Sequence, residues 1–240
     1  MDWMLNSSMA AVPIFETLAY WRDERARSGA ENMAVDQLLM ETVGHHPVLR
    51  VYQWSEPTVS FGYFHSLHEA QAAFPCTVAH PLTYVRRWTG GGVVDHRADL
   101  TYTLVIPRGY PLADERGARS YHLIHQILGQ TLKKQGQDVR LVAADESASG
   151  PVCFTSPAAY DLADAEGMKI AGAGQRRTRY GLLHQGSLLT ALDAGTLGRE
   201  LASNLADTVR DYAVSESFDE QVALLAAERY GTGEWHRGMA

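Results

Sequence analysis

Cysteine is scarce in this chain of 240 residues, which contains only Cys76 and Cys153. Two cysteines are too few for a disulfide-stabilised scaffold or a cysteine-rich zinc site, and their spacing fits neither a CxxC redox pair nor a zinc finger. A reducing cytoplasm is therefore the expected setting of the protein.

A surplus of basic charge is also missing, because the formal net charge is -7. A protein that follows phosphates along nucleic acid, or that binds an anionic membrane surface, needs a basic surplus. We therefore expect neither nucleic acid nor a membrane among the partners.

Long hydrophobic runs and a basic leader are absent from the N-terminal stretch MDWMLNSSMAAVPIF. This stretch predicts neither a signal peptide nor a membrane anchor, and residues 1–12 are expected to be disordered. With 45% hydrophobic and 20% charged residues, the chain is of the ordinary globular class, and no sharp linker divides it. A single domain over residues 1–240 is expected.

The pattern of apolar and turn-forming residues predicts an α+β fold, with strands in neighbouring pairs and few helices. Helices are expected from Asn32, as N-cap, to Gly44, over Ser120–Gln135 before Gly136, and from a capping box of Ser217 and Glu220 to about Tyr230. Strands are expected over residues 48–54, 58–62, 83–86, 101–107, 138–142, 168–177 and 181–189.

Several common sites can be excluded by their motifs. The stretch TGGGVVDH lacks the lysine and the following helix of a phosphate loop, and GAGQRR has Arg177 in place of the third glycine of a dinucleotide fingerprint. His122 and His125 share a helical face, but no carboxylate stands at a diagnostic spacing from them, so no metal site is predicted. A G-x-S-x-G nucleophile elbow is also absent.

Three features remain as candidates for chemistry. RRWTGGGVVDH, residues 86–96, places three glycines between two predicted strands, where a ligand could approach the backbone closely. Cys153 lies in a polar, turn-like stretch that is a poor environment for simple burial, and a nearby cation would lower the pKa of its thiol. Lys169 stands beside the small residues of the strand IAGAG and is the candidate for that cation.

Four segments in this order resemble the lipoate-protein ligase and octanoyltransferase family, within the biotin/lipoate A/B protein ligases: NMAVDQLL, EPTVSFGYF, RRWTGGGVVDHRADLTY and GMKIAGAGQRRTRYGLLHQGSLL. They span residues 32–189. The resemblance implies a mixed, largely antiparallel sheet flanked by helices, like the catalytic domain of biotin- and lipoate-protein ligases and similar to class II aminoacyl-tRNA synthetases. It also implies attachment of a lipoyl or octanoyl group to one lysine of a lipoyl carrier domain, of the glycine cleavage H protein or 2-oxoacid dehydrogenase E2 type.

The resemblance further implies the roles of individual residues. Lys169 falls on the lysine of the family's G-x-K motif, which contacts the acyl carbonyl, and Cys153 resembles the cysteine of octanoyltransferases that relay the acyl group. We expect the Lys169 amine to face a narrow hydrophobic slot whose mouth is walled by the triple glycine. The acyl- or adenylate-binding residues are expected to be Gly62, Arg86, Arg87, Thr89, Gly90, Gly91, Gly92, His96, Asp161, Gly172, Gln175 and Gly186.

Two routes divide this family. In one route, ATP and magnesium activate free lipoate or octanoate as an adenylate; in the other, a cysteine takes the acyl group from acyl carrier protein and needs no cofactor. The surroundings of Cys153 favour the relay with octanoate, and only about fifty residues follow Leu189, so no separate C-terminal accessory domain is expected. The third glycine of the loop, Gly92, is typical of the ligases. Arg97, His65 and Gln185 stand at positions where the family commonly has other residues.

Two other activities remain as alternatives. A non-catalytic member of the family could bind lipoate or lipoyl domains, although it would not need Lys169. Biotin attachment is a weaker alternative, because the biotin branch usually shows a different glycine and arginine pattern.

Overall fold

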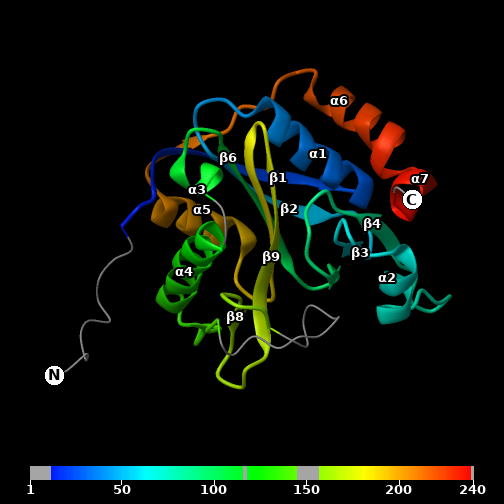
Figure 1. The fold of residues 1–240 in the computed structure, drawn as a ribbon, viewed down its shortest axis with the longest axis horizontal. Helices are drawn as coiled ribbons and strands as arrows, with labels where there is room; N and C mark the ends of the chain where they lie inside the picture. The colour runs from blue at the N-terminus through cyan, green and yellow to red at the C-terminus, as the bar shows by residue number, and fades with distance from the viewer. Residues whose placement is uncertain (1–11, 116–117, 145–156, 239–240) are drawn as a thin grey trace.

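The structure, a computed structural model, describes residues 12–115, 118–144 and 157–238. Its centre is an eight-stranded sheet in the order β11-β1-β2-β6-β10-β9-β8-β7, beside a three-stranded sheet in the order β4-β3-β5 (Figure 1). In the large sheet β1 pairs in parallel with β2 and β11, whereas the other pairs are antiparallel. The predicted α+β fold with a mixed, largely antiparallel sheet is confirmed.

The strands of the large sheet are β1 (Phe15–Arg27), β2 (Val48–Trp54), β6 (Leu100–Pro107), β7 (Arg140–Leu141), β8 (Leu162–Ala163), β9 (Lys169–Thr178), β10 (Gly181–Leu188) and β11 (Ala206–Asp211). Those of the small sheet are β3 (Thr58–Phe61), β4 (Thr83–Arg86) and β5 (Val93–Asp95). The helices are α1 (Gly29–Thr42), α2 (Leu67–Ala73), α3 (Pro111–Asp114), α4 (Arg119–Lys134), α5 (Ala194–Leu205), α6 (Phe218–Leu225), the π-helical turn η1 (Ala226–Tyr230) and α7 (Gly233–Arg237).

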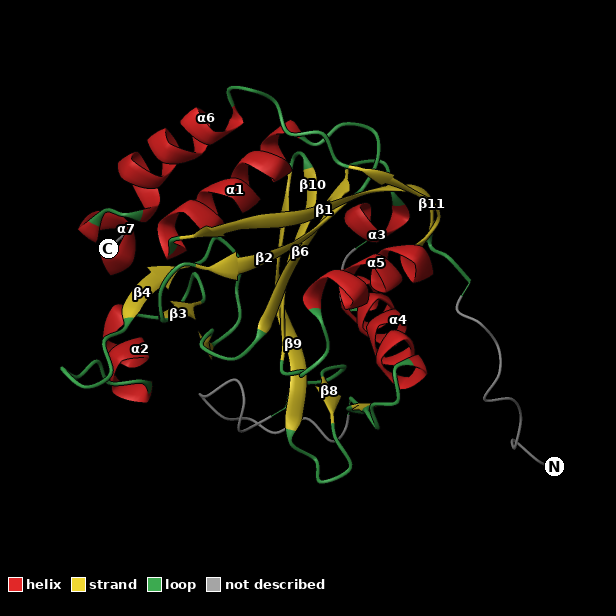
Figure 2. Cartoon of the chain, turned by 180° about the vertical axis from the view of Figure 1, so that it is seen from behind, coloured by secondary structure: helices red, strands yellow, loops and turns green. Residues whose placement is uncertain are grey.

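Helices cover both faces of the large sheet, as the view from behind shows (Figure 2). Side chains of a strand alternate between faces, so Leu49 and Leu104 pack with Ile124 of α4 and Leu201 of α5 in one core cluster. On the opposite face α1 and α6 form a second cluster with Val48, Val105 and Leu183. The sheet is thus the middle layer of three.

The small sheet has an apolar cluster of its own, in which Val59, Phe61 and Val93 pack against Ala70 of α2. Strand β4 leads into residues 87–92, which we call the glycine loop, and β5 follows it. The small sheet therefore fixes both ends of the glycine loop.

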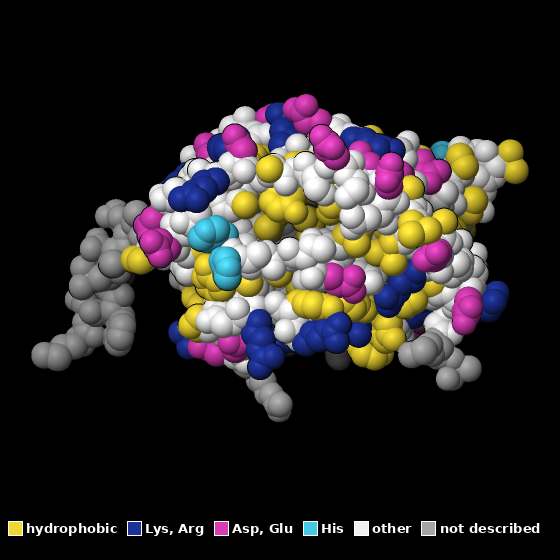
Figure 3. All heavy atoms as spheres, turned by 90° about the horizontal axis from the view of Figure 1, so that it is seen from above, with side chains coloured by type: hydrophobic (Ala, Val, Ile, Leu, Met, Phe, Trp, Pro, Cys, Tyr) yellow, Lys and Arg dark blue, Asp and Glu magenta, His cyan; other side chains and the backbone are white. Residues whose placement is uncertain are grey.

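Acidic and basic side chains are interspersed on the face of the molecule seen from above (Figure 3). No helix in the described ranges combines the length and the apolar composition that crossing a bilayer would require.

Two of the predicted helix caps are wrong. Helix α1 begins after Ser28, which forms a capping box with Glu31, while Asn32 lies inside the helix and donates to the carbonyls of Arg27 and Gln53. Ser217 precedes α6 with φ -84° and ψ 0° and makes no side-chain cap bond, because its backbone is already helical.

The predicted strands are present. Those at 48–54 and 83–86 have the predicted ends, the strand at 138–142 shrinks to β7, and the ends of the others differ by one residue. Strands β1, β5, β8 and β11 and helices α2, α3, α5 and α7 were not predicted. The expectation for residues 1–12 concerns a stretch that, apart from Val12, lies outside the described residues.

Candidate active site

A narrow slot lies between the large sheet and the small sheet, with an empty volume of about 480 Å³ that includes the open solvent at its mouth. The large sheet contributes Tyr52, Trp54, Thr101, Lys169, Gly172, Ala173, Gly174, Gln185, Gly186 and Ser187. The opposite side consists of Met33, Ser60, Arg87, Gly91, Gly92, Val94 and His96.

The floor of the slot crosses four strands of the large sheet. Gly172 of β9 pairs with Ser187 of β10, Ser187 pairs with Thr101 of β6, and Thr101 pairs with Tyr52 of β2. Three strand spacings separate β9 from β2, which is about 14 Å. Lys169 lies at the β9 end of this row, and Tyr52 and Trp54 lie at the β2 end.

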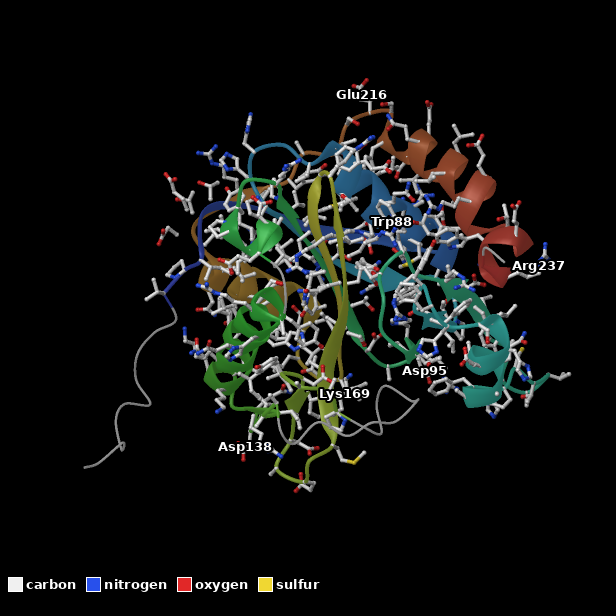
Figure 4. The ribbon with its side chains drawn as sticks, viewed as in Figure 1. Trp88, Asp95, Asp138, Lys169, Glu216 and Arg237 are labelled. Atoms are coloured by element: carbon white, nitrogen blue, oxygen red, sulfur yellow. The ribbon has the colours of Figure 1, made fainter. Side chains whose placement is uncertain are left out.

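Lys169 is 8% exposed, and its Nζ lies 2.8 Å from Oδ2 of the fully buried Asp161. It lies at the start of β9, whereas Trp88 of the glycine loop lies on the side of β9 toward the small sheet (Figure 4). A Cβ on Gly172 would stand 2.4 Å from the Lys169 Nζ. Glycine at position 172 therefore leaves space for the lysine side chain itself, not only for a ligand as the sequence pattern indicated.

Asp161 is held from several sides. Its Oδ1 accepts a hydrogen bond from the Tyr121 hydroxyl, whose oxygen accepts from the Ala173 N–H at 2.9 Å. Its Oδ2 accepts from the Ala158 N–H at 2.7 Å. Burial and the nearby carboxylate raise the pKa of Tyr121 well above its ordinary value, so the phenol remains a hydrogen-bond donor. Lys169 is thereby placed against a fixed anion.

Two histidines lie beneath this ion pair, on the α4 side of the sheet. His125 Nδ1 donates to the Tyr160 carbonyl at 2.7 Å, and burial lowers the pKa of His125 to about 4. Burial also lowers the pKa of His184 well below its ordinary value, and its ring lies 5.5 Å from that of His125. Both rings are neutral at pH 7, so neither adds a positive charge beside Lys169.

The glycine loop is held by Arg87. Arg87 donates from Nη2 to the carbonyls of Gly92 at 2.8 Å and Gly90 at 3.2 Å, and from Nη1 to Ser60 Oγ at 2.7 Å. A Cβ on Gly62 would stand 1.8 Å from the Gly91 carbonyl oxygen, so only glycine permits this approach of the two backbones.

Thr89 fixes the loop to the sheet. Its hydroxyl donates to Gln185 Oε1 at 2.7 Å, and Gln185 Nε2 donates to Asp36 Oδ2 at 2.7 Å. The loop is therefore connected through Gln185 to the buried carboxylate of α1.

The slot brings together about half of the predicted site residues, namely Arg87, Gly91, Gly92, His96, Lys169, Gly172 and Gly186. The others support the slot from outside its lining: Gly62, Thr89, Gly90 and Asp161 as described above, and Arg86 and Gln175. Arg86 donates to the carbonyls of Tyr63 and His236, and Gln175 contacts His184 and Ser120. Cys153 lies outside the described residues.

The sequence did not point to the far end of the slot. Tyr52 and Trp54 form it together with Ser60, Thr101 and Met33. The period of two along β2 could have placed Tyr52 and Trp54 on one face of the strand, but not against the small sheet.

Comparisons with known proteins agree with this architecture. Residues 28–231 match the family model described as the lipoyl protein ligase A/B catalytic domain. The chain is 35% identical over 210 residues to the octanoyltransferase LipM of Kyrpidia tusciae, covering 82% of this chain and 74% of that protein.

Two solved structures share the fold at 19% sequence identity. A bi-partite lipoate protein ligase from Thermoplasma acidophilum, solved in work that included its E2 lipoyl domain, has a TM-score of 0.66 and covers 94% of this chain and 97% of its own. Lipoate-protein ligase A bound with ATP has a TM-score of 0.67 and covers 94% of this chain and 100% of its own.

Proposed function

Since the chain belongs to the lipoyl protein ligase A/B catalytic domain family, whose members are enzymes of protein lipoylation, we propose that it transfers an octanoyl group onto one lysine of a lipoyl carrier domain. In this proposal Cys153 takes the octanoyl group from acyl carrier protein as a thioester, and the carrier lysine then attacks that thioester. Lipoate is the second acyl group that the same slot would accept.

The observation that carries the proposal is the buried Lys169–Asp161 pair at the end of the slot. Attack on a thioester carbonyl places negative charge on its oxygen, and a fixed cation in a water-poor site stabilises that charge. Asp161 holds the lysine in place at 2.8 Å, so the amine can act as this cation.

The slot suits a short acyl chain. It is narrow, runs across the sheet for about three strand spacings, and ends at aromatic side chains of β2. The backbone of Gly91 and Gly92 lies along it without side chains, which leaves room for the acyl group.

Chain connectivity is compatible with a role for Cys153. It stands five positions before Ala158, whose N–H is bonded to Asp161, so the two Cα atoms are at most about 19 Å apart. Lys169 is bonded to the same carboxylate. Cys153 therefore stands close along the chain to a residue that contacts the partner of Lys169.

The ATP-dependent route fits the described residues less well. Asp161 is the carboxylate beside Lys169, and its two oxygens already contact Lys169, Ala158 and Tyr121. A magnesium ion on Asp161 would have to displace at least one of these partners. Within the described ranges no group of three His, Cys, Asp or Glu side chains is arranged to hold a metal.

Intact-mass spectrometry after incubation with octanoyl acyl carrier protein tests the proposal. We expect a hydroxylamine-labile octanoyl adduct on the wild type, which Cys153→Ala abolishes and Cys76→Ala, at an exposed free cysteine, retains. Transfer to a lipoyl domain should need no ATP. Full activity of Cys153→Ala together with ATP-dependent pyrophosphate exchange would establish the ligase route instead, and binding of lipoyl domains without any transfer would indicate a non-catalytic member.

A further inference from the structure

A tyrosine outside the slot lining connects the Lys169 ion pair with the wall of the slot. Tyr121 lies in the first turn of α4, and its hydroxyl donates to Asp161 Oδ1 and accepts from the Ala173 N–H at 2.9 Å. Asp161 is paired with Lys169, and Ala173 lines the slot. One hydroxyl group therefore bonds both to the anion beside the cation and to the backbone beside the space proposed for the acyl group.

The neighbours of the Tyr121 hydroxyl fix the direction of its proton. A backbone N–H can only donate, so the Ala173 bond uses a lone pair of the oxygen and leaves the single proton for Asp161. Burial, followed by the charge of Asp161, raises the pKa of Tyr121 well above its ordinary value. The phenol therefore remains a donor at neutral pH, and a hydrogen bond to a carboxylate is about twice as strong as one between neutral groups.

This bond holds one of the two carboxylate oxygens of Asp161. The other oxygen, Oδ2, accepts from the Ala158 N–H at 2.7 Å and pairs with the Lys169 Nζ at 2.8 Å. Oδ1 lies 3.1 Å and Nζ lies 2.4 Å from the place where a Cβ of Gly172 would stand, so the amine has both oxygens nearby. Because each oxygen accepts from a donor on α4 or on the backbone, the carboxylate is held against rotation and the amine is directed to one position.

The same part of α4 also holds the turn that carries Asp161. His125, one helical turn after Tyr121, donates from Nδ1 to the Tyr160 carbonyl at 2.7 Å, and the His122 ring stacks on the Tyr160 ring with centroids 4.5 Å apart. Tyr160 has a φ of 67°, a left-handed conformation that costs free energy in a residue other than glycine. Such a backbone persists where its surroundings determine it, so the contacts from α4 help to place Asp161.

The position of the Lys169 amine matters for the rate of the proposed reaction. A cation stabilises a developing oxyanion best when it is held in place before the reaction begins. The four-carbon side chain of lysine is flexible, so its position depends on the anion with which it pairs. Tyr121 does not line the slot, so loss of its hydroxyl should change the rate of acyl transfer more than the binding of the acyl group.

We infer that Tyr121 is a positioning residue, which fixes Asp161 and through it the direction of the Lys169 amine toward the acyl carbonyl. The inference rests on the proposed function, but it is the same whether the acyl group arrives as a thioester or as an adenylate. In both cases attack by the carrier lysine places negative charge on the carbonyl oxygen. Tyr121 acts through Asp161 and contacts no reacting atom.

Tyr121→Phe tests this role, because it keeps the ring that packs on His125 and removes only the hydroxyl. Octanoyl transfer from acyl carrier protein to a lipoyl domain is measured over a range of donor concentrations, at a temperature where every variant is folded. We expect kcat to fall by about 10 to 10²-fold, with the KM for the donor changed by less than about twofold. Tyr110→Phe is the matched control, since the Tyr110 hydroxyl bonds to the His45 carbonyl and neither residue lines the slot.

A double-mutant cycle with Lys169→Met separates positioning from a structural role. If Tyr121 acts through Lys169, Tyr121→Phe should lower the residual rate of the Lys169→Met protein by less than about twofold. A structural role would lower the rate by the same factor in both backgrounds. A loss in the Lys169→Met background as large as that in the wild-type background, or a kcat of Tyr121→Phe close to that of the wild type, overturns the inference.

The measurements also separate failure of the inference from failure of the proposed function. Asp161→Asn, which keeps the shape of the side chain, decides the matter if Tyr121→Phe does not fold, since an unchanged kcat in that variant would equally overturn the inference. A wild type that transfers an octanoyl group neither from acyl carrier protein nor from octanoate and ATP overturns the proposed function. An active wild type with an equally active Tyr121→Phe overturns the inference alone.

Discussion

The large sheet contains two buried ion pairs, one at Arg50 and one at Lys169, and they differ in their surroundings. Arg50 of β2 is fully buried, bonds to Asp23 at 2.7 Å and Asp36 at 2.9 Å, and lies over the Tyr52 ring at 3.9 Å. Lys169 is paired with Asp161 at 2.8 Å and borders the slot. The Arg50 cluster is enclosed and saturated, whereas the cation of the Lys169 cluster faces a space where a substrate can lie.

Burial of charged groups costs free energy even in the Arg50 cluster, where the charges are paired. Burial raises the pKa of Asp36 above its ordinary value, although Arg50, Gln185 and Thr103 oppose the shift. A buried ion pair is therefore poor evidence of net stabilisation, but removing one partner leaves a charge uncompensated. This predicts a loss of stability at both sites, and a loss of rate as well at Lys169, which borders the slot.

Arg50→Met should have the largest effect on stability, because it leaves Asp23 and Asp36 buried without their shared cation. We expect the free energy of unfolding to fall by about 3–5 kcal/mol in urea titrations. Arg210→Met, on exposed β11, should change it by less than about 0.5 kcal/mol. Equal losses in the two variants would contradict the distinction between the clusters.

Lys169→Met should have the largest effect on rate. Removal of one group that stabilises an oxyanion lowers kcat by about 10² to 10³-fold. We expect that loss in octanoyl transfer under conditions where the variant is folded, with a lower melting temperature because Asp161 stays buried without this cation, and full activity for the exposed Lys133→Met. Residual transfer near the wild-type rate would show that Lys169 is structural, like Arg50.

Acid should destabilise the Lys169 side of the sheet through His125. Its pKa is 6.5 when unfolded and about 4 when folded, so between these values the unfolded chain binds more protons. The free energy of unfolding is therefore highest above pH 6.5 and falls toward pH 4, by about 3 kcal/mol for this group. His184 shifts the balance in the same direction.

Urea titrations at pH 7.5 and 5.0 test this window. His125→Gln should show a smaller loss between the two values than the wild type, whereas His46→Gln, at an exposed site, should match the wild type. An identical loss in all three proteins would assign the acid sensitivity to other groups.

Gln185→Met should have the smallest effect on stability and on rate. It changes both, because Gln185 connects Asp36 of the Arg50 cluster with Thr89 of the glycine loop. Loss of these bonds leaves buried groups unpaired, at about 1–3 kcal/mol. We also expect a fall in octanoyl transfer far smaller than for Lys169→Met. Unchanged stability and rate would mean that the loop is held by Arg87 alone, and Gln221→Met provides the exposed control.

The sequence predicted elements with a clear local pattern and missed those that depend on distant partners. The strand Thr83–Arg86 and the helix before Gly136 agree with the structure within one residue. Strand β1 was missed because its second half, WRDERAR, is crowded with charges. Asp23 and Arg27 are buried there only because Arg50 and Asp219 compensate them, and both partners are far along the chain.

For the candidate site, too, the sequence indicates the residues that stand in local motifs and misses those that depend on distant partners. The glycine loop and Lys169 stand in recognisable motifs, so their meeting in one slot could be expected from the sequence. The hydrogen bond from Ser187 to Asp99 could not, since it joins a strand to a loop 88 residues away. Tyr121 contributes from α4 to Asp161 across 40 residues, and no local pattern marks it.

The orientation of the slot limits how its length can change. Because it runs across the strands, its length is set by how many strands it crosses, in steps of about 4.8 Å. Lengthening the strands would not deepen it. Evolution or design toward a longer fatty chain would have to reshape side chains at β2, where the row of Gly172, Ser187, Thr101 and Tyr52 ends.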